Sequence, residues 1–456
     1  MLPLLAVLTL AQAIPDEPPP EPVEVVRPQE VRSLPGQFDD VPMFNSNSPE
    51  LVQSGGILLS TFSPEGKTHP NAHLNFPFTG RFDVFAHHVY RSVTEGDLTT
   101  LYLGILLYNP GTEPVTVDIL QAASYLSQPD APFISLPPLV ENPRGEVYAG
   151  PGSRAMSDIL RGQRQDSFPS QVEVPPDGYQ LLMNVPIPIA DLDPPINGRS
   201  TLMRVRSSDT VYAASLALFA PTDDEGVERE PTLDEWIEVL NTGELAEMRD
   251  RTPTPLDQTT GQVIYGRVSG VSEGSLWQAQ VVDSPESTTL TIPAAGEAFS
   301  YGISTLIAGR MGTEQVQSAP MLVRYPDTAY QSHGNYAAEY NLSLPLYNPD
   351  SRDRTVTIAL ETPLKEDSLS TDGLRFLEPP AEQVFFRGTV RLRYTDDRGF
   401  PQTRYVHLVE QRGQMGEPLV TLTMPGETRR LVNIDLLYPP DSTPPQMLTV
   451  QTLVDE

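Results

Sequence analysis

Apolar and polar residues alternate over short stretches of the chain, and Pro, Gly, Asn or Asp separate most of these stretches. A period of two places alternate side chains on opposite faces of an extended strand, so the pattern predicts strands with one buried face. Many short strands with turn residues between them are typical of antiparallel β-sandwiches. The clearest examples are GGILLST, GRFDVFAHHVYRSV, TTLYLGILLYNP, EPVTVDIL, TLMRVRSS and TVYAASLALFAP.

One predicted hairpin occurs twice. The sequence LYNPGTEPVTVDI, residues 107–119, returns without a gap as LYNPDSRDRTVTI, residues 346–358. Pro110 and Gly111 fit the two central positions of a type II turn, whereas Asp350 in the second copy favours type I. In both copies the outgoing strand has one apolar and one polar face, which predicts two equivalent, half-buried strands.

Two further pairs of segments resemble each other. PPDGYQLLMNVPI, residues 175–187, is similar to MPGETRRLVNIDL, residues 424–436, and TDDEG at Thr222 is similar to TDDRG at Thr395. Loops of unequal length account for the different spacings. We therefore expect an internal duplication.

The fold predicted from these patterns is all-β, with two tandem Ig-like antiparallel β-sandwich domains joined by a short helical linker segment. The expected parts are a signal peptide at 1–13, an extended Pro/Glu-rich arm at 14–40, a first sandwich at 41–228, a helix and linker at 229–258, and a second sandwich at 259–456.

The linker contains one helical pattern, PTLDEWIEVLNTGELAEMRD, residues 231–250. Thr232 is the expected N-cap, and Glu235 three residues later completes a capping box. Trp236 and Leu240 fall on one face, and Gly243 interrupts the pattern. A Trp at such a place is most often a packing residue.

The first residues indicate export. An apolar run from Leu2 to Leu10 precedes Ala11-Gln12-Ala13, the small-x-small pattern that signal peptidase cleaves,. The run is too short to cross a bilayer, and no later segment is long enough either. A basic n-region is missing, so a buried N-terminal strand is the alternative interpretation. The arm that follows is expected to be an extended, mobile spacer.

Composition excludes several partners and chemistries. The chain has 60 acidic and 30 basic residues and a net charge of −30, which disfavours nucleic acids and anionic membranes,. It has no cysteine, so disulfides, thiolate chemistry and cysteine-bound metals are excluded,. Its 48 prolines disfavour long helices,.

Histidines gather in the first predicted sandwich and raise the question of a zinc-type site. His87 and His88 are neighbours in a predicted strand, so their side chains point to opposite faces. His73 is able to meet one of them across a hairpin. The candidate ligands are therefore His73, His87 and His88, and ordinary packed histidines are the alternative.

Carboxylates suggest a second, calcium-type candidate in Asp223, Asp224, Asp396 and Asp397. Calcium prefers several oxygen ligands, and an acidic exported protein suits it. However, the sequence D-D-x-G between strands is also a good turn. Calcium is thus possible, and the sequence indicates no other cofactor.

Two other motifs have simple structural interpretations. Gly270–Gly274 matches the G-x-S-x-G nucleophile elbow, but the expected neighbours are strands, whereas the elbow needs a helix after the serine. The aromatic segments NFPFTGRFDVF and GNYAAEYNLSLPLY are able to stack on sugar rings or anchor a partner, although aromatics on strands usually belong to the core.

Several long segments resemble those of a known family. They include NSNSPELVQSGGILLSTFSPEGK, HGNYAAEYNLSLPLYNP and FFRGTVRLRYTDDRGFPQTRYVHLVEQRG. With them the chain resembles, over nearly its whole mature length, a cyanobacterial family of exported proteins of unknown function. The resemblance implies a cyanobacterial source and an envelope or extracellular setting. It implies no active site.

Three functions are compatible with the sequence. The first is a non-enzymatic structural or interaction protein of the cell envelope, located in the periplasm or at the cell surface. The second is a protein that binds envelope or exopolysaccharide glycans. The third is a hydrolase that uses a metal or a carboxylate pair. The partner and the oligomeric state are not predicted.

Overall fold

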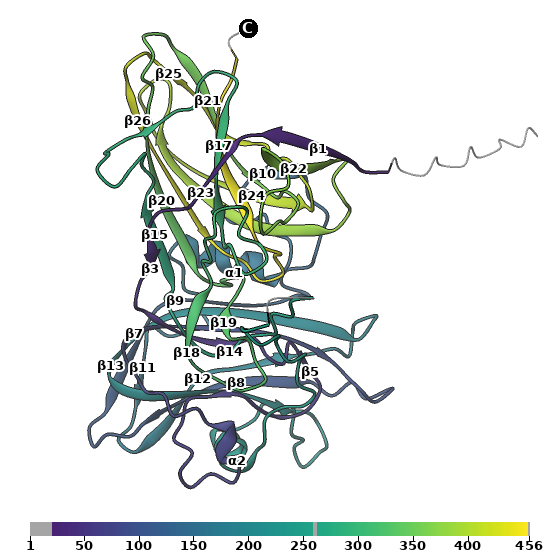
Figure 1. The fold of residues 1–456 in the computed structure, drawn as a ribbon. Helices are drawn as coiled ribbons and strands as arrows, with labels where there is room; N and C mark the ends of the chain where they lie inside the picture. Colours follow the sequence, from purple (N-terminus) through teal and green to yellow (C-terminus); the bar gives the residue numbers. More distant parts are fainter. Residues whose placement is uncertain (1–20, 259–261, 455–456) are drawn as a thin grey trace, which may run out of the picture.

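The computed structural model describes residues 21–258 and 262–454. Strands dominate it, so the all-β prediction is confirmed. The strands form two sheet-rich lobes stacked on each other, with one helix between them and another at the far end of one lobe (Figure 1). The expected signal peptide lies outside the described residues.

The N-terminal lobe is built on the twelve-stranded sheet. Its longest strand, β13 (Ile196–Phe219), pairs with β7 and β9 through its first half and with β6 and β8 through its last eight residues. β13 therefore belongs to two layers, and the core lies between them. The other strands are β4 (Pro42–Ser46), β5 (Leu51–Val52), β6 (Gly56–Ser60), β7 (Phe78–Arg91), β8 (Leu101–Asn109), β9 (Val115–Leu126), β11 (Gln171–Val174), β12 (Gly178–Ile187), β14 (Ser269–Glu273), β18 (Ala319–Arg324) and β19 (Gln331–Ser332).

The C-terminal lobe has an eight-stranded and a five-stranded sheet around a second core. The first sheet contains β3 (Gln37–Phe38), β10 (Leu139–Glu141), β15 (Leu276–Gln280), β16 (Leu290–Thr291), β20 (Glu339–Tyr347), β23 (Val384–Thr395), β24 (Pro401–Gln411) and β26 (Arg429–Leu437). The second contains β2 (Glu30–Arg32), β17 (Ala298–Ile303), β21 (Arg354–Glu361), β25 (Pro418–Met424) and β27 (Gln446–Thr452), and β1 (Val23–Pro28) pairs with β22 (Gly373–Glu378) beside them.

Strands cross the expected boundary between the two halves of the chain. The segment β10 lies in the N-terminal half of the sequence but pairs with β24 of the C-terminal lobe. Conversely, β14 and β18 come after residue 258 but extend the N-terminal lobe, where β14 pairs with β4. The lobes therefore exchange strands, and residues 41–228 and 259–456 are not two separate sheet systems.

The expected arm is not a free spacer over its described part. All six residues of β1 pair with β22, and β2 and β3 pair with β17 and β15. Arg27 also donates to the buried carboxylate of Glu361 at 3.0 Å. Backbone pairing and this ion pair attach the segment to the C-terminal lobe, which corrects our expectation of mobility.

The repeated hairpin has the same hydrogen bonds in both lobes. In the first copy the side-chain amide of Asn109 donates to the carbonyl oxygens of Glu113 and Val174, and its oxygen accepts from the N–H of Gly111. In the second, Asn348 makes the equivalent bonds to Arg352, Met424 and Asp350. The second pair of similar segments forms β12 and β26, which occupy equivalent places beside β8 and β20.

The lobes bury separate cores and meet at a third. Val117 lies in the core of the N-terminal lobe and its counterpart Val356 in that of the C-terminal lobe. Between the lobes, helix α1 (Pro151–Leu160) packs Met156 and Ile159 against both sides of the interface. We call this interface the seam. The sequence patterns above did not predict this helix.

The linker helix forms as predicted at its N-terminus. Helix α2 (Leu233–Thr242) begins after the N-cap Thr232, has both hydrogen bonds of the capping box with Glu235, and ends at Gly243. The predicted pattern continued to residue 250, but Met248 is exposed and lies outside the helix. A short 3₁₀ helix, η1, covers Pro70–Ala72.

Candidate functional site

Three tyrosines form a row on the outer face of the N-terminal lobe. Tyr108 on β8 lies directly opposite Tyr179 on β12 and Tyr212 on β13, so the three share one face of adjacent strands. The ring centres of Tyr108 and Tyr179 are 4.8 Å apart, and those of Tyr108 and Tyr212 are 6.5 Å apart. All three side chains are partly exposed. We call this surface the tyrosine face.

A buried phenylalanine supports the row. The ring of Phe62 is 2% exposed and lies 5.8–6.3 Å from the three tyrosine rings. Lys67 lies over the Phe62 ring and donates to Asn241 at 2.6 Å. Phe62 therefore packs against all three tyrosine rings and supports them from one side,.

An acidic residue borders the tyrosine face. The hydroxyl of Tyr108 donates to the carboxylate of Asp177 at 2.6 Å. This hydrogen bond, with a smaller contribution from burial, raises the pKa of Tyr108 to about 12. The phenol therefore stays neutral and presents a fixed polar edge next to a carboxylate acceptor.

Helix α2 covers the neighbouring part of the same sheet face. The ring of Trp236 lies over Gly104, where an added Cβ would come within 2.8 Å of it. The indole N–H donates to the side chain of Asn184 at 3.3 Å. The outer face is thus divided into a part closed by α2 and the tyrosine face beside the repeated turn.

The aromatic residues singled out from the sequence belong mostly to the interior. Phe78, Phe82 and Phe85 are buried, as is Tyr340. Tyr108 belongs to a motif that was recognised for its turn. Its outward orientation could have been predicted from the alternation along the strand, since Leu107 and Ile105 face the core and Tyr108 therefore points to the opposite face,.

The predicted histidines do not come together on one ion. Nδ1 of His73 lies 2.8 Å from Oγ of Ser60, and the ring nitrogens of His88 contact Ser46 and the carbonyl oxygen of Pro49. Burial lowers the pKa of His73 and of His88 to about 4, so both rings are neutral near pH 7.

His87 points to a different set of partners. Its Nε2 lies 3.7 Å from Oδ1 of Asp441 and 4.0 Å from Oε1 of Glu50. These three side chains are the ones among the described residues whose ligand atoms gather within 4.8 Å of one another. The sequence did not indicate them as a group, because Asp441 comes from the other lobe.

The paired aspartates lie at two separate turns. The carboxylate of Asp223 accepts the N–H groups of Glu225 and Val227, and that of Asp396 accepts the N–H groups of Arg398 and Phe400 in the same way.

Of their neighbours, Asp397 pairs with Arg430 and Asp224 is exposed. The structure thus gives Asp223 and Asp396 a turn-forming role. The resemblance between TDDEG and TDDRG reflects turn chemistry rather than the duplication.

The G-x-S-x-G motif does not form an elbow. Ser272 is buried in β14, which is followed by strand β15 and not by a helix. The strands β14 and β15 enter different lobes instead of pairing with each other as a hairpin.

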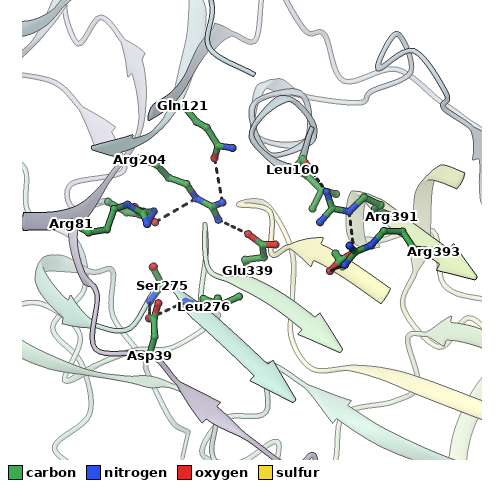
Figure 2. Close-up of polar contacts among 12 residues, drawn as sticks. Asp39, Arg81, Gln121, Leu160, Arg204, Ser275, Leu276, Glu339, Arg391 and Arg393 are labelled. Atoms are coloured by element: carbon green, nitrogen blue, oxygen red, sulfur yellow. Dashed lines mark hydrogen bonds and ion pairs between the residues drawn. The ribbon is translucent and has the colours of Figure 1, made fainter. Parts of the chain in front are cut away.

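Buried charges connect the lobes at the seam (Figure 2). Arg204 of β13 donates to Glu339 of β20 at 2.6 Å and to Gln121. Arg391 contacts Asp435, which is fully buried, and donates to the carbonyl oxygen of Leu160 at the end of α1. Because removing one partner of a buried pair leaves a desolvated charge, these contacts hold the lobes in one arrangement.

A groove of about 800 Å³ runs beside β2, and Arg32, Asp283 and Tyr301 contribute to its lining. Tyr301 is its only aromatic residue and is 2% exposed. The groove is therefore polar, and its aromatic ring is not accessible for stacking.

No helix within residues 21–258 and 262–454 is long and apolar enough to cross a membrane. No curated protein matches the chain. Among solved structures, the recombinant pro-11S globulin of pumpkin shows 11% identity and a TM-score of 0.11, with 93% of this chain and 86% of that chain covered. This likeness is too low to carry an argument.

The family comparison is more informative. A model described as "Protein of unknown function (DUF3370)" matches residues 29–452, which include both lobes and the seam. The chain therefore belongs to this family of proteins of unknown function.

Proposed function

We propose that the chain is an exported, non-enzymatic interaction protein of the cell envelope and that it binds a glycan through the tyrosine face. In this proposal two Ig-like lobes, held rigid by the seam, present the face to the periplasm or the cell surface. The apolar run at residues 2–10 supports export,.

The observation that carries the proposal is the alignment of Tyr108, Tyr179 and Tyr212 on three adjacent strands. Large aromatic side chains that remain partly exposed on a sheet offer apolar ring surface together with a polar tip. A sugar ring presents the complementary combination of an apolar C–H face and hydroxyl groups. Asp177 at the border supplies an acceptor for such hydroxyls.

Charge narrows the class of glycan. The chain carries a net charge of −30, and a carboxylate lies beside the face. Like charges repel across an interface, so sulfated and uronic-acid polymers are disfavoured. The proposed ligand is a neutral or amino-sugar polysaccharide.

The experiment is a glycan array probed with the purified chain and with the double variant Tyr108→Ala/Tyr179→Ala. Tyr347→Ala is the matched control, because Tyr347 is the counterpart of Tyr108 in the C-terminal lobe. We expect binding to neutral glycans that the double variant loses and the control keeps. An array without signal above background contradicts the proposal.

Location is tested separately by fractionating the native protein among cytoplasm, periplasm, outer membrane and medium. Export predicts that the cytoplasmic fraction is nearly empty. A protein that remains in the cytoplasm would contradict the envelope role. If the array is silent and a pull-down from envelope extracts recovers one reproducible protein, the partner is a protein and not a glycan.

A further inference from the structure

We infer that Glu50, His87 and Asp441 form a binding site for one divalent transition-metal ion of the zinc type, which joins the two lobes at the seam. This inference is independent of the tyrosine face.

The three side chains come from both lobes. His87 is on β7 and Glu50 lies in the loop before β5, both in the N-terminal lobe. Asp441 lies in the loop between β26 and β27 of the C-terminal lobe, with a positive φ of 64°. An ion bound by all three would therefore link the lobes directly.

The imidazole is oriented as a metal ligand needs. Nδ1 of His87 lies 2.8 Å from Oγ of Ser200, the residue directly opposite on β13. When Nδ1–H donates to this hydroxyl, Nε2 presents its lone pair toward the two carboxylates. A second-shell partner on the other ring nitrogen is typical of metal-bound histidines. The side chain is also 5% exposed and hence well fixed.

The distances suit an ion after a small adjustment. Nε2 is 3.7 Å from Asp441 and 4.0 Å from Glu50. Two ligands of a tetrahedral zinc ion lie roughly 3.3 Å apart, since each bond is about 2.0–2.1 Å long. Glu50 and Asp441 therefore need to approach Nε2 by roughly 0.4–0.7 Å. Their own ligand atoms, which lie within 4.8 Å of each other, need to come closer as well. Both side chains are partly exposed on loops, which permits this movement.

Two nearby arginines lower the affinity that we expect for the metal ion. Arg267 contacts Oε2 of Glu50, which leaves Oε1 for the ion. Arg387 of the C-terminal lobe interacts electrostatically with Asp441. Two carboxylates already opposed by two arginines attract a cation less than free carboxylates do. We therefore expect a micromolar affinity, weaker than that of a closed structural zinc site.

The donor set selects the class of metal. One imidazole and two carboxylates suit zinc and similar ions, whereas calcium requires six to eight oxygen ligands. Three protein ligands leave a fourth position for water.

The test is isothermal titration of ZnCl₂ into the EDTA-treated full chain, with CaCl₂ as the comparison ion. We expect one zinc ion per chain, a rise in the thermal midpoint with zinc, and no saturable calcium heat. Asp441→Asn and Glu50→Gln are each expected to weaken zinc binding at least tenfold. Both residues are partly exposed, so these variants are expected to fold.

Asp224→Asn is the control, because it removes an exposed carboxylate from a turn outside the cluster. It is expected to bind zinc as the parent chain does. Absence of stoichiometric zinc binding overturns the inference. Equal binding by the parent chain and by Asp441→Asn also overturns it, since the ion would then be elsewhere.

Discussion

The two copies of the repeated hairpin have the same turn but different outer faces. Asn109 and Asn348 make equivalent hydrogen bonds. Asp177 and Glu427 both have a positive φ, 46° and 55°, and their backbone N–H groups donate to equivalent carbonyl oxygens. The outer faces of the copies differ. Tyr108 lies opposite Tyr179 and Tyr212 on the neighbouring strands. Its counterpart Tyr347 lies opposite Arg429 and Thr291. Within the part of the chain that the structure describes, Tyr347 therefore has no aromatic residue directly opposite it on a neighbouring strand.

The shared turn and the divergent outer face have different explanations. A turn that closes a hairpin needs the same polar groups in both lobes, since a buried Asn without partners costs stability in either place. The three tyrosines also pack against the buried cluster that contains Phe62, but the equivalent positions around Tyr347 carry Arg429 and Thr291, so the hairpin itself does not require an aromatic row. The shared turn is what an internal duplication predicts, and the divergent face is the surface that we propose for binding.

The first prediction concerns a feature that only the C-terminal lobe has. Glu361 and Glu410 are buried together there, and position 361 corresponds to Ala122 in the other copy. Burial raises the pKa of Glu410 to about 8, with Glu361 adding repulsion. An unfolded glutamate titrates near pH 4.3, so the unfolded chain releases a proton that the folded chain retains. The stability that the buried carboxyl of Glu410 contributes is fully present below about pH 4.3 and is lost as the pH rises toward 8,.

Between pH 5 and pH 8 we expect Glu410 to lower the free energy of unfolding by roughly 3–4 kcal/mol,. The buried rings of His333 and His407, whose pKa burial lowers to about 4, offset part of this fall because they add stability as the pH rises from 5,. Glu410→Gln should remove most of the decrease. Urea denaturation followed through Trp277, the tryptophan of the C-terminal lobe, measures it. The same pH dependence in the parent chain and in Glu410→Gln contradicts the assignment of a neutral Glu410.

The second prediction tests whether the hydrogen bonds of Asn109 and Asn348 stabilise the two turns equally. Asn109→Ala and Asn348→Ala each remove the side-chain donor of one buried carbonyl oxygen, that of Val174 or that of Met424, and each is expected to cost about 2 kcal/mol,. The loss should appear in Trp236 fluorescence for the first variant and in Trp277 fluorescence for the second. Losses that differ by more than about 1 kcal/mol would show that the copies are not energetically equivalent.

The third prediction tests the packing of helix α2 on the outer face of the N-terminal lobe. Gly104→Ala places a methyl group against Trp236 and is expected to cost about 2 kcal/mol,. The matched change in the other copy is Ser343→Ala, which removes one partly exposed hydrogen bond to Asn433 and is expected to cost less than about 1 kcal/mol,. Thermal denaturation of both variants shows whether Gly104→Ala costs more stability than Ser343→Ala. An equal cost would mean that α2 does not pack closely on β8.

Local chemistry was predictable from the sequence, and pairing at long range was not. The capping box of α2 and the repeated turn depend on residues within a few positions of each other. In contrast, the pairing of β1 with β22 joins segments about 350 residues apart. The separation of β14 from β15 also depends on which lobe each strand enters, and no local pattern encodes that choice.

The candidate site was missed for the same reason. Whether Tyr108 faces solvent or the core depends on the register of β8 against β12 and β13. His87 was identified as a candidate ligand, but Asp441 lies more than 350 positions away. Only the packing of the lobes brings these two side chains together.

The most direct test is titration of the glycan selected on the array into three proteins, the parent chain, Tyr108→Ala and Tyr347→Ala. Removing one stacking ring from the tyrosine face is expected to weaken binding about tenfold, or about 1.4 kcal/mol. Removing its counterpart in the C-terminal lobe is expected to leave the affinity unchanged. Equal affinity of all three proteins, or a greater loss with Tyr347→Ala, would contradict the assignment of binding to the N-terminal lobe.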